Sequence, residues 1–157
     1  MSMFEEYNPN PIIGKRVGDC VIRAICKATG KDWETVFTEL MVRACKLCDM
    51  PSANYVWGAY LKDLGYQRHL IDDHGRYIYT VNDFCTDHPT GTYILCIDGH
   101  VVTVQEGKYF DTWDSGNEIP VYYWEKEQLN EHTGIYSIVS FSLRRSINYW
   151  RGSSRNL

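Results

Sequence analysis

The hydrophobic pattern of this chain changes its period near Gly91, and this change constrains the fold more than any other feature. Before Gly91, apolar residues recur at three- and four-residue spacing, which is typical of helices with one buried face. After it, short β-branched and aromatic segments are separated by turn dipeptides, which is typical of antiparallel strands. This order predicts an α+β fold in which N-terminal helices pack on a C-terminal antiparallel β-sheet.

The helical half divides at residues that commonly cap helices. Asp19, Asp32, Ser52 and Thr80 each precede an apolar periodic segment, as expected of N-caps. The predicted helices therefore span residues 19–30, 32–47, 52–65 and 80–89. The second carries the longest apolar stripe, formed by Trp33, Val36, Phe37, Leu40, Met41, Ala44 and Leu47.

The strand half contains five candidate strands, at residues 92–97, 100–105, 108–113, 119–124 and 135–143. Asp98-Gly99 and Glu106-Gly107 separate the first three, and such pairs tolerate the positive φ of tight hairpin turns. Residues 1–17 are predicted to form an irregular leader and residues 144–157 a polar basic tail. A length of 157 residues fits one domain, 1–157.

Charge and hydropathy exclude several classes of partner. The net charge is −4, whereas general nucleic-acid binding needs clustered positive charge, so no nucleic-acid partner is expected. No apolar run reaches the roughly 20 residues that a membrane span needs, so no membrane partner is expected. The amino terminus lacks the apolar region of a secretory signal. We therefore expect a cytoplasmic protein, whose six cysteines are reduced thiols.

Cys20 is the candidate nucleophile, because it lies at the start of the first predicted helix, after Gly18-Asp19. Unpaired backbone N–H groups and the positive end of the helix dipole lie there. Both lower the pKa of a thiol and favour the nucleophilic thiolate. A buried cysteine with only a packing role is the alternative interpretation.

His100 is the candidate base, since it begins the strand that follows Asp98-Gly99. A two-residue turn at Glu106-Gly107 would pair Val104 with Tyr109 and place Asp111 on the same face of the hairpin as His100. A three-residue turn would bring Asp114 to the histidine instead. We prefer Asp111 as the group that orients the imidazole.

A cysteine at a helix start, a histidine on a strand and an aspartate on the next strand resemble the papain-like cysteine peptidases. The chain is most similar to the small bacteriocin-leader-peptidase-like members encoded by phages and prophages. The matching residues are 18–20, 99–102 and 109–114, and the resemblance extends from Val17 to about Trp124. It implies a thiol-dependent hydrolase of peptide or isopeptide bonds that acts on a protein or peptide through an acyl-enzyme, without cofactor or metal.

The resemblance also implies an oxyanion-hole glutamine about six residues before the cysteine, but that position here is Gly14. Asn10, assisted by the backbone N–H of Cys20, is the predicted substitute. An acyl transferase on the same scaffold and a catalytically inactive papain-like binding module are the alternative functions. A zinc site at Cys45 and Cys48 is disfavoured, because no second pair of ligands follows.

Overall fold

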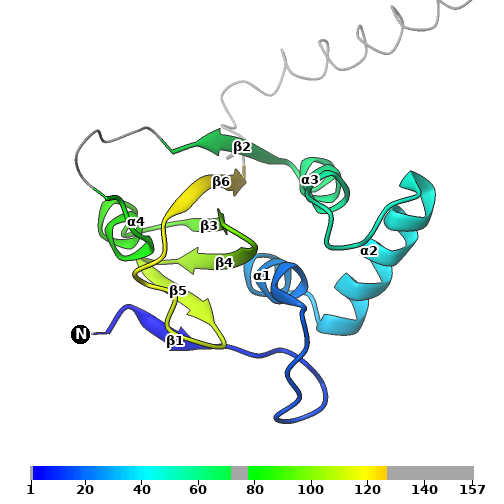
Figure 1. Cartoon of the computed structure of the whole chain (residues 1–157), viewed down its shortest axis with the longest axis horizontal. Helices are drawn as coiled ribbons and strands as arrows, with labels where there is room; N and C mark the ends of the chain where they lie inside the picture. Colours follow the sequence, from blue (N-terminus) through cyan, green and yellow to red (C-terminus); the bar gives the residue numbers. More distant parts are fainter. Residues whose placement is uncertain (1, 72–77, 127–157) are drawn as a thin grey trace, which may run out of the picture. The chain divides into compact units, whose positions relative to one another are not determined.

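The computed structural model describes residues 2–71 and 78–126, which form four helices and a six-stranded mixed sheet (Figure 1). The α+β class is therefore as predicted. The helices are α1 (Cys20–Thr29), α2 (Trp33–Leu47), α3 (Asn54–Asp63) and α4 (Val81–Asp87). The strands are β1 (Phe4–Glu6), β2 (Tyr66–Leu70), β3 (Thr92–Ile97), β4 (His100–Gln105), β5 (Lys108–Asp111) and β6 (Pro120–Lys126).

The sheet has the order β1-β5-β4-β3-β6-β2. Its pairs are antiparallel except β1 with β5, which run parallel. The prediction of a purely C-terminal, antiparallel sheet is wrong at both edges. β1 lies within the leader that was expected to be irregular, and β2 lies among the helices. Both strands pair with partners that are distant in sequence, and β1 is only three residues long. Neither strand therefore has a local sequence pattern from which it could be predicted.

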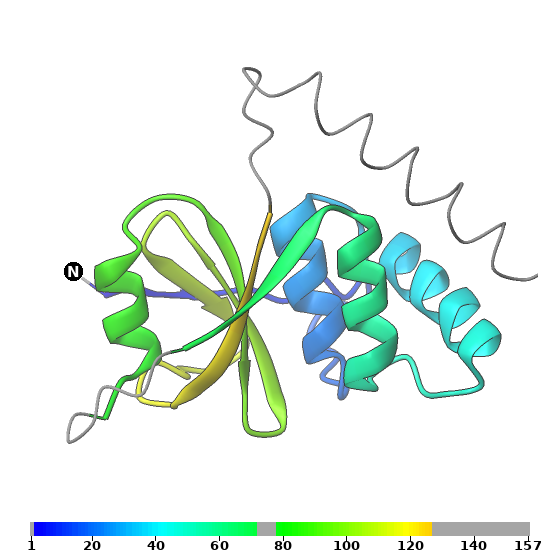
Figure 2. The same ribbon diagram turned by 90° about the horizontal axis from the view of Figure 1, so that it is seen from above.

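Helices cover both faces of the sheet (Figure 2). On one face, α1 and α3 pack against the sheet and α2 packs outside them, around buried residues such as Ile25, Leu40 and Trp57. On the other face, α4 packs through Phe84 against the far sides of β3, β4 and β5. Because the strands alternate their side chains, β4 contributes Val101 to the first core and Val102 to the second.

The helix starts follow the predicted caps in part. Asp32 accepts from the Thr35 N–H at 2.8 Å, and Thr80 forms a capping box with Asp83. Ser52 is not a cap, since α3 begins two residues later, after Ala53. In α2, the buried stripe is narrower than predicted: Val36, Leu40 and Ala44 are buried, whereas Phe37 and Met41 are more than a third exposed.

Several predictions fall on the remaining part of the chain. The strand at 135–143, the basic tail at 144–157 and the extension of a single domain to residue 157 lie outside the described residues. None of the helices in the described ranges combines the length and apolar character that crossing a membrane requires.

Candidate active site

Cys20 is the first residue of α1 and is partly buried. Asp19 occupies the N-cap position, but its side chain does not cap the helix. The first N–H groups of α1 therefore have no capping side chain and lie beside the thiol, at the positive end of the helix dipole. This is the placement that the sequence predicts for a reactive cysteine.

His100 is positioned by the tight turn between β3 and β4, in which Gly99 has a φ of 66°. Its imidazole is 16% exposed, and Nε2 lies 2.5 Å from Oδ2 of Asp111. Asp111 ends β5, and the pairing of Val104 with Tyr109 is the register predicted for a two-residue turn. The hairpin therefore brings together the histidine and the preferred aspartate.

Cys20 and His100 meet across the boundary between helix and sheet. Burial raises the pKa of the Cys20 thiol, but a hydrogen bond with the His100 ring, the imidazolium charge and the Val101 N–H together lower it below its usual value. Since Nε2 of His100 contacts Asp111, the nitrogen available to Cys20 is Nδ1. Burial also lowers the pKa of His100, but hydrogen bonds to Asp111 and Cys20 raise it to about 9. Both shifts favour a thiolate–imidazolium pair.

Asp111 is held by several donors and is only 2% exposed. Its Oδ2 accepts from the Ser115 hydroxyl at 2.9 Å, and its Oδ1 accepts from the Thr112 N–H at 2.7 Å. Burial raises the pKa of this carboxyl, but the His100 hydrogen bond and charge, with these donors, keep it below its usual value. The carboxylate therefore stays ionised and fixed beside the imidazole.

Arg23 links Asp111 to α1, the helix that begins with Cys20. This role of Arg23 was not predicted from the sequence. One guanidinium nitrogen pairs with Asp19, while Nη2 lies 3.3 Å from Oδ1 of Asp111. Asp19 also accepts from the indole N–H of Trp33 at 2.8 Å. One sequence feature could have indicated this ion pair: Arg23 interrupts the otherwise apolar segment 21–26 and follows Asp19 by four residues.

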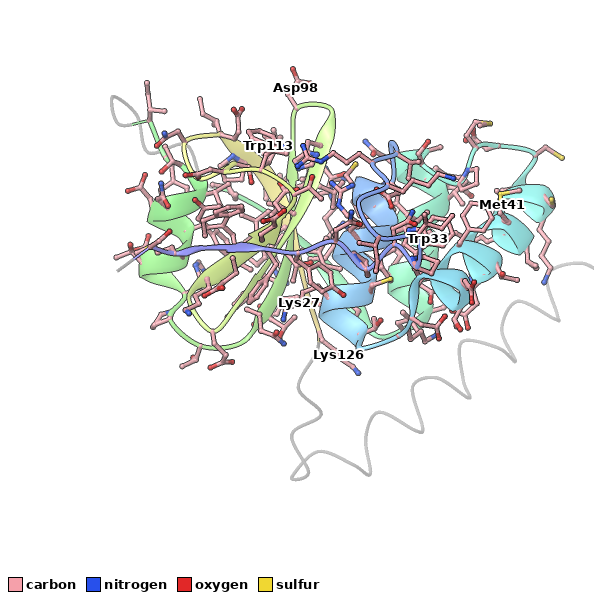
Figure 3. All side chains as sticks on the ribbon, turned by 90° about the horizontal axis from the view of Figure 1, so that it is seen from below. Lys27, Trp33, Met41, Asp98, Trp113 and Lys126 are labelled. Carbon is pink, nitrogen blue, oxygen red and sulfur yellow. The ribbon has the colours of Figure 1, made fainter. Side chains whose placement is uncertain are left out.

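A cavity of about 610 Å³ opens beside the thiol and the imidazole. It lies between the starts of α1 and α3, the β3–β4 turn and β6. Asp98 projects from the outer end of that turn, and Trp113 lies on the same side of the molecule (Figure 3). We call this space the active-site cavity. Residues from these elements that line it include Cys20, Asn54, Cys96, Asp98, His100 and Tyr122.

The two other predicted site residues lie elsewhere. Asn10 is not among the residues that line the active-site cavity, and its Oδ1 accepts from the Ile12 N–H at 3.0 Å within the leader. Asp114 accepts from the Tyr109 hydroxyl and from the Gly116 N–H rather than from His100. The structure thus brings together Cys20, His100 and Asp111, without Asn10.

The remaining cysteines divide into buried and exposed thiols. Cys26, Cys85 and Cys96 are buried, whereas Cys45, in the last turn of α2, and Cys48, its C-cap, are exposed. Cys45 and Cys48 lie outside the core, because the buried stripe of α2 does not extend to them. Residues 2–71 and 78–126 contain no cluster of three or more potential metal ligands.

No protein-family model, characterised protein or solved structure is significantly similar to this chain.

Proposed function

We propose that this chain is a thiol-dependent hydrolase of peptide or isopeptide bonds that acts on a protein or peptide. Cys20 is its nucleophile, His100 its acid and base, and Asp111 the group that orients the imidazole. One observation carries the proposal: thiol, imidazole and buried carboxylate form a continuous hydrogen-bonded series at the wall of a cavity. Their order along the chain supports a papain-like relationship.

The proposed reaction begins with attack of the Cys20 thiolate on the carbonyl carbon. A C–S bond forms while the carbonyl π electrons move to oxygen. Collapse of this intermediate breaks the C–N bond, and His100 gives its proton to the leaving amine. Water then loses a proton to His100 and attacks the thioester, which releases the carboxylic acid and restores the thiolate–imidazolium pair.

In this proposal, backbone N–H groups at the start of α1 stabilise the oxyanion. The backbone N–H of Cys20 is among the first of the helix, where N–H groups have no intrahelical acceptor. Loss of a side-chain donor from an oxyanion hole typically slows the reaction by about 100- to 1,000-fold. Hydrolysis is therefore expected to be slow unless another donor takes the role predicted for Asn10.

A catalytically inactive binding module is the second candidate, and the position of Asn10 is the observation that favours it. Its side-chain oxygen is engaged within the leader, away from the active-site cavity. An acyl transferase would use the same cysteine, histidine and aspartate as the hydrolase, with an amine in place of water.

Selective alkylation of Cys20 tests the proposal. Iodoacetamide at about pH 6.5 should label Cys20 well before Cys45 and Cys48, which are exposed thiols and serve as internal references. The selectivity should disappear in His100→Ala and persist in His69→Ala, because His69 lies on β2 and stacks on Tyr123 instead. Equal labelling of the exposed and partly buried thiols would reject the catalytic reading and favour the binding module.

A further inference from the structure

A second cavity, of about 410 Å³, adjoins the active-site cavity between α3 and the strands β2 and β6. The two cavities share Asn54 and Tyr122 in their walls. Asn54 and Lys62 contribute from α3, at positions eight residues apart on one helix face. Arg68 and Trp124 contribute from the sheet, where they are paired directly across β2 and β6. We call this space the Arg68 cavity.

The charged residues that line the Arg68 cavity are both cationic. Arg68 and Lys62 are exposed side chains, and neither forms an ion pair within the described chain. The Arg68 guanidinium stacks on Tyr122, 3.9 Å from the ring centroid, which restrains it over the wall that the two cavities share. No aspartate or glutamate lines this cavity.

Two uncharged polar residues of the wall, Asn54 and Trp124, have donor groups without a partner, whereas the tyrosine hydroxyls can donate or accept. Trp124 is 3% exposed, and its indole N–H is the single buried side-chain polar atom without a partner in the described ranges. Asn54 uses its Oδ1 to accept from the Trp57 indole at 3.1 Å, so its amide N–H₂ remains available. The Asn54 amide therefore offers a donor to an acceptor group of a ligand in this cavity.

We propose that the Arg68 cavity binds a carboxylate side chain of the substrate, close to the bond that Cys20 attacks. This inference rests on the proposed function, since it assigns a substrate class to the same site. A carboxylate supplies acceptor atoms only, which matches a wall with two cations and donor groups. Asp98, which lines the active-site cavity, would repel the same carboxylate there, so the acidic residue binds at one position only.

Chloroacetyl tripeptides provide the probe. In each, the Cys20 thiolate displaces chloride, so that one C–S bond forms as one C–Cl bond breaks and chloride leaves. One glutamate is moved through the three peptide positions, and each peptide is paired with its glutamine counterpart. Intact-protein mass spectrometry gives the rate of labelling. At one position glutamate should react about tenfold faster than glutamine at low ionic strength, and salt should weaken the preference.

Arg68→Gln should bring the glutamate-to-glutamine rate ratio at that position close to unity, with folding checked by thermal unfolding. Lys46→Gln is the matched control, because Lys46 is an exposed cation on α2 outside both cavities, and it should keep the ratio. A ratio near unity in the unaltered protein, or a preference that survives Arg68→Gln, would overturn the inference. Absence of selective Cys20 labelling by iodoacetamide would instead overturn the proposed function, which separates the two failures.

Discussion

His100 and Asp111 stand on neighbouring strands of one hairpin, with Nε2 of the imidazole 2.5 Å from Oδ2 of the carboxylate. The contact fixes which ring nitrogen faces Cys20, because the nitrogen bonded to Asp111 is no longer available. It also stabilises the imidazolium, and the imidazolium in turn lowers the pKa of the thiol. A carboxylate at the end of β5 thus affects the reactivity of a cysteine at the start of α1, although the two side chains are not in direct contact.

Replacing Asp111 by asparagine should make Cys20 less reactive near neutral pH. The amide keeps the shape of the side chain but removes the charge, so the pKa of His100 falls and the thiol loses its charged partner. The pH midpoint of Cys20 alkylation should rise by about one unit or more. Asp114→Asn is the control, since Asp114 contacts Tyr109 and Gly116, and an equal shift in both variants would contradict this role of Asp111.

The raised pKa of His100 should also appear in the pH dependence of stability. The folded-state pKa of about 9 exceeds the ordinary value of 6.5, so the stabilisation is complete below about pH 6.5 and is lost as the pH rises towards 9. The lowered pKa of Cys20 acts in the opposite direction, and a Cys20→Ala background removes it. In that background Asp111 alone raises the pKa, so the loss should be complete by about pH 9.

Urea unfolding of Cys20→Ala and of Cys20→Ala/His100→Gln measures this effect. The difference in unfolding free energy between the two should be larger at about pH 6 than at about pH 10, by on the order of 1–2 kcal/mol. A difference that does not change with pH would show that the histidine is not charged in the folded protein.

The part of the site that lies within one hairpin was predictable from the sequence. Glu106 and Gly107 have φ values of 51° and 70°, as a two-residue turn requires, and this turn fixes the register between β4 and β5. Once the register is set, alternation of side chains places Asp111 on the face of His100. His100 and Asp111 are only 11 positions apart, so the rules for the turn and for side-chain alternation were sufficient.

Contacts between distant segments were not predictable in the same way. β1 pairs Phe4 with Tyr109, across more than one hundred positions, and no local pattern marks either partner. The contact between Arg23 and Asp111 spans 88 positions and depends on how α1 docks on the sheet. The sequence shows that an arginine interrupts an apolar helix, but the docking determines which carboxylates it meets.

Thr103→Val should weaken the docking of α1 on the sheet. Thr103 is fully buried on β4, and its hydroxyl donates to the Ala24 carbonyl of α1 at 2.7 Å. Valine keeps the shape but removes the hydrogen bond, so the free energy of unfolding should fall by about 1 kcal/mol. Thr86→Val is the control, because Thr86 is exposed and donates to Asn82 within α4, and it should change stability by less than about 0.5 kcal/mol.

Arg23→Met should be the most destabilising of these substitutions. Arg23 is 8% exposed and pairs with Asp19 and Asp111, which are 5% and 2% exposed, so its removal leaves buried Asp19 without its cation and Asp111 with His100 alone. Breaking a buried ion pair in this way typically costs about 3–5 kcal/mol, which urea unfolding at neutral pH would measure. Arg43→Met should cost less than about 1 kcal/mol, because its partner Asp63 is 64% exposed and remains hydrated after the change. Equal losses in the two variants would mean that Arg23 contributes no more than a surface ion pair, and its link between the helix of Cys20 and the strand of Asp111 would then have no energetic basis.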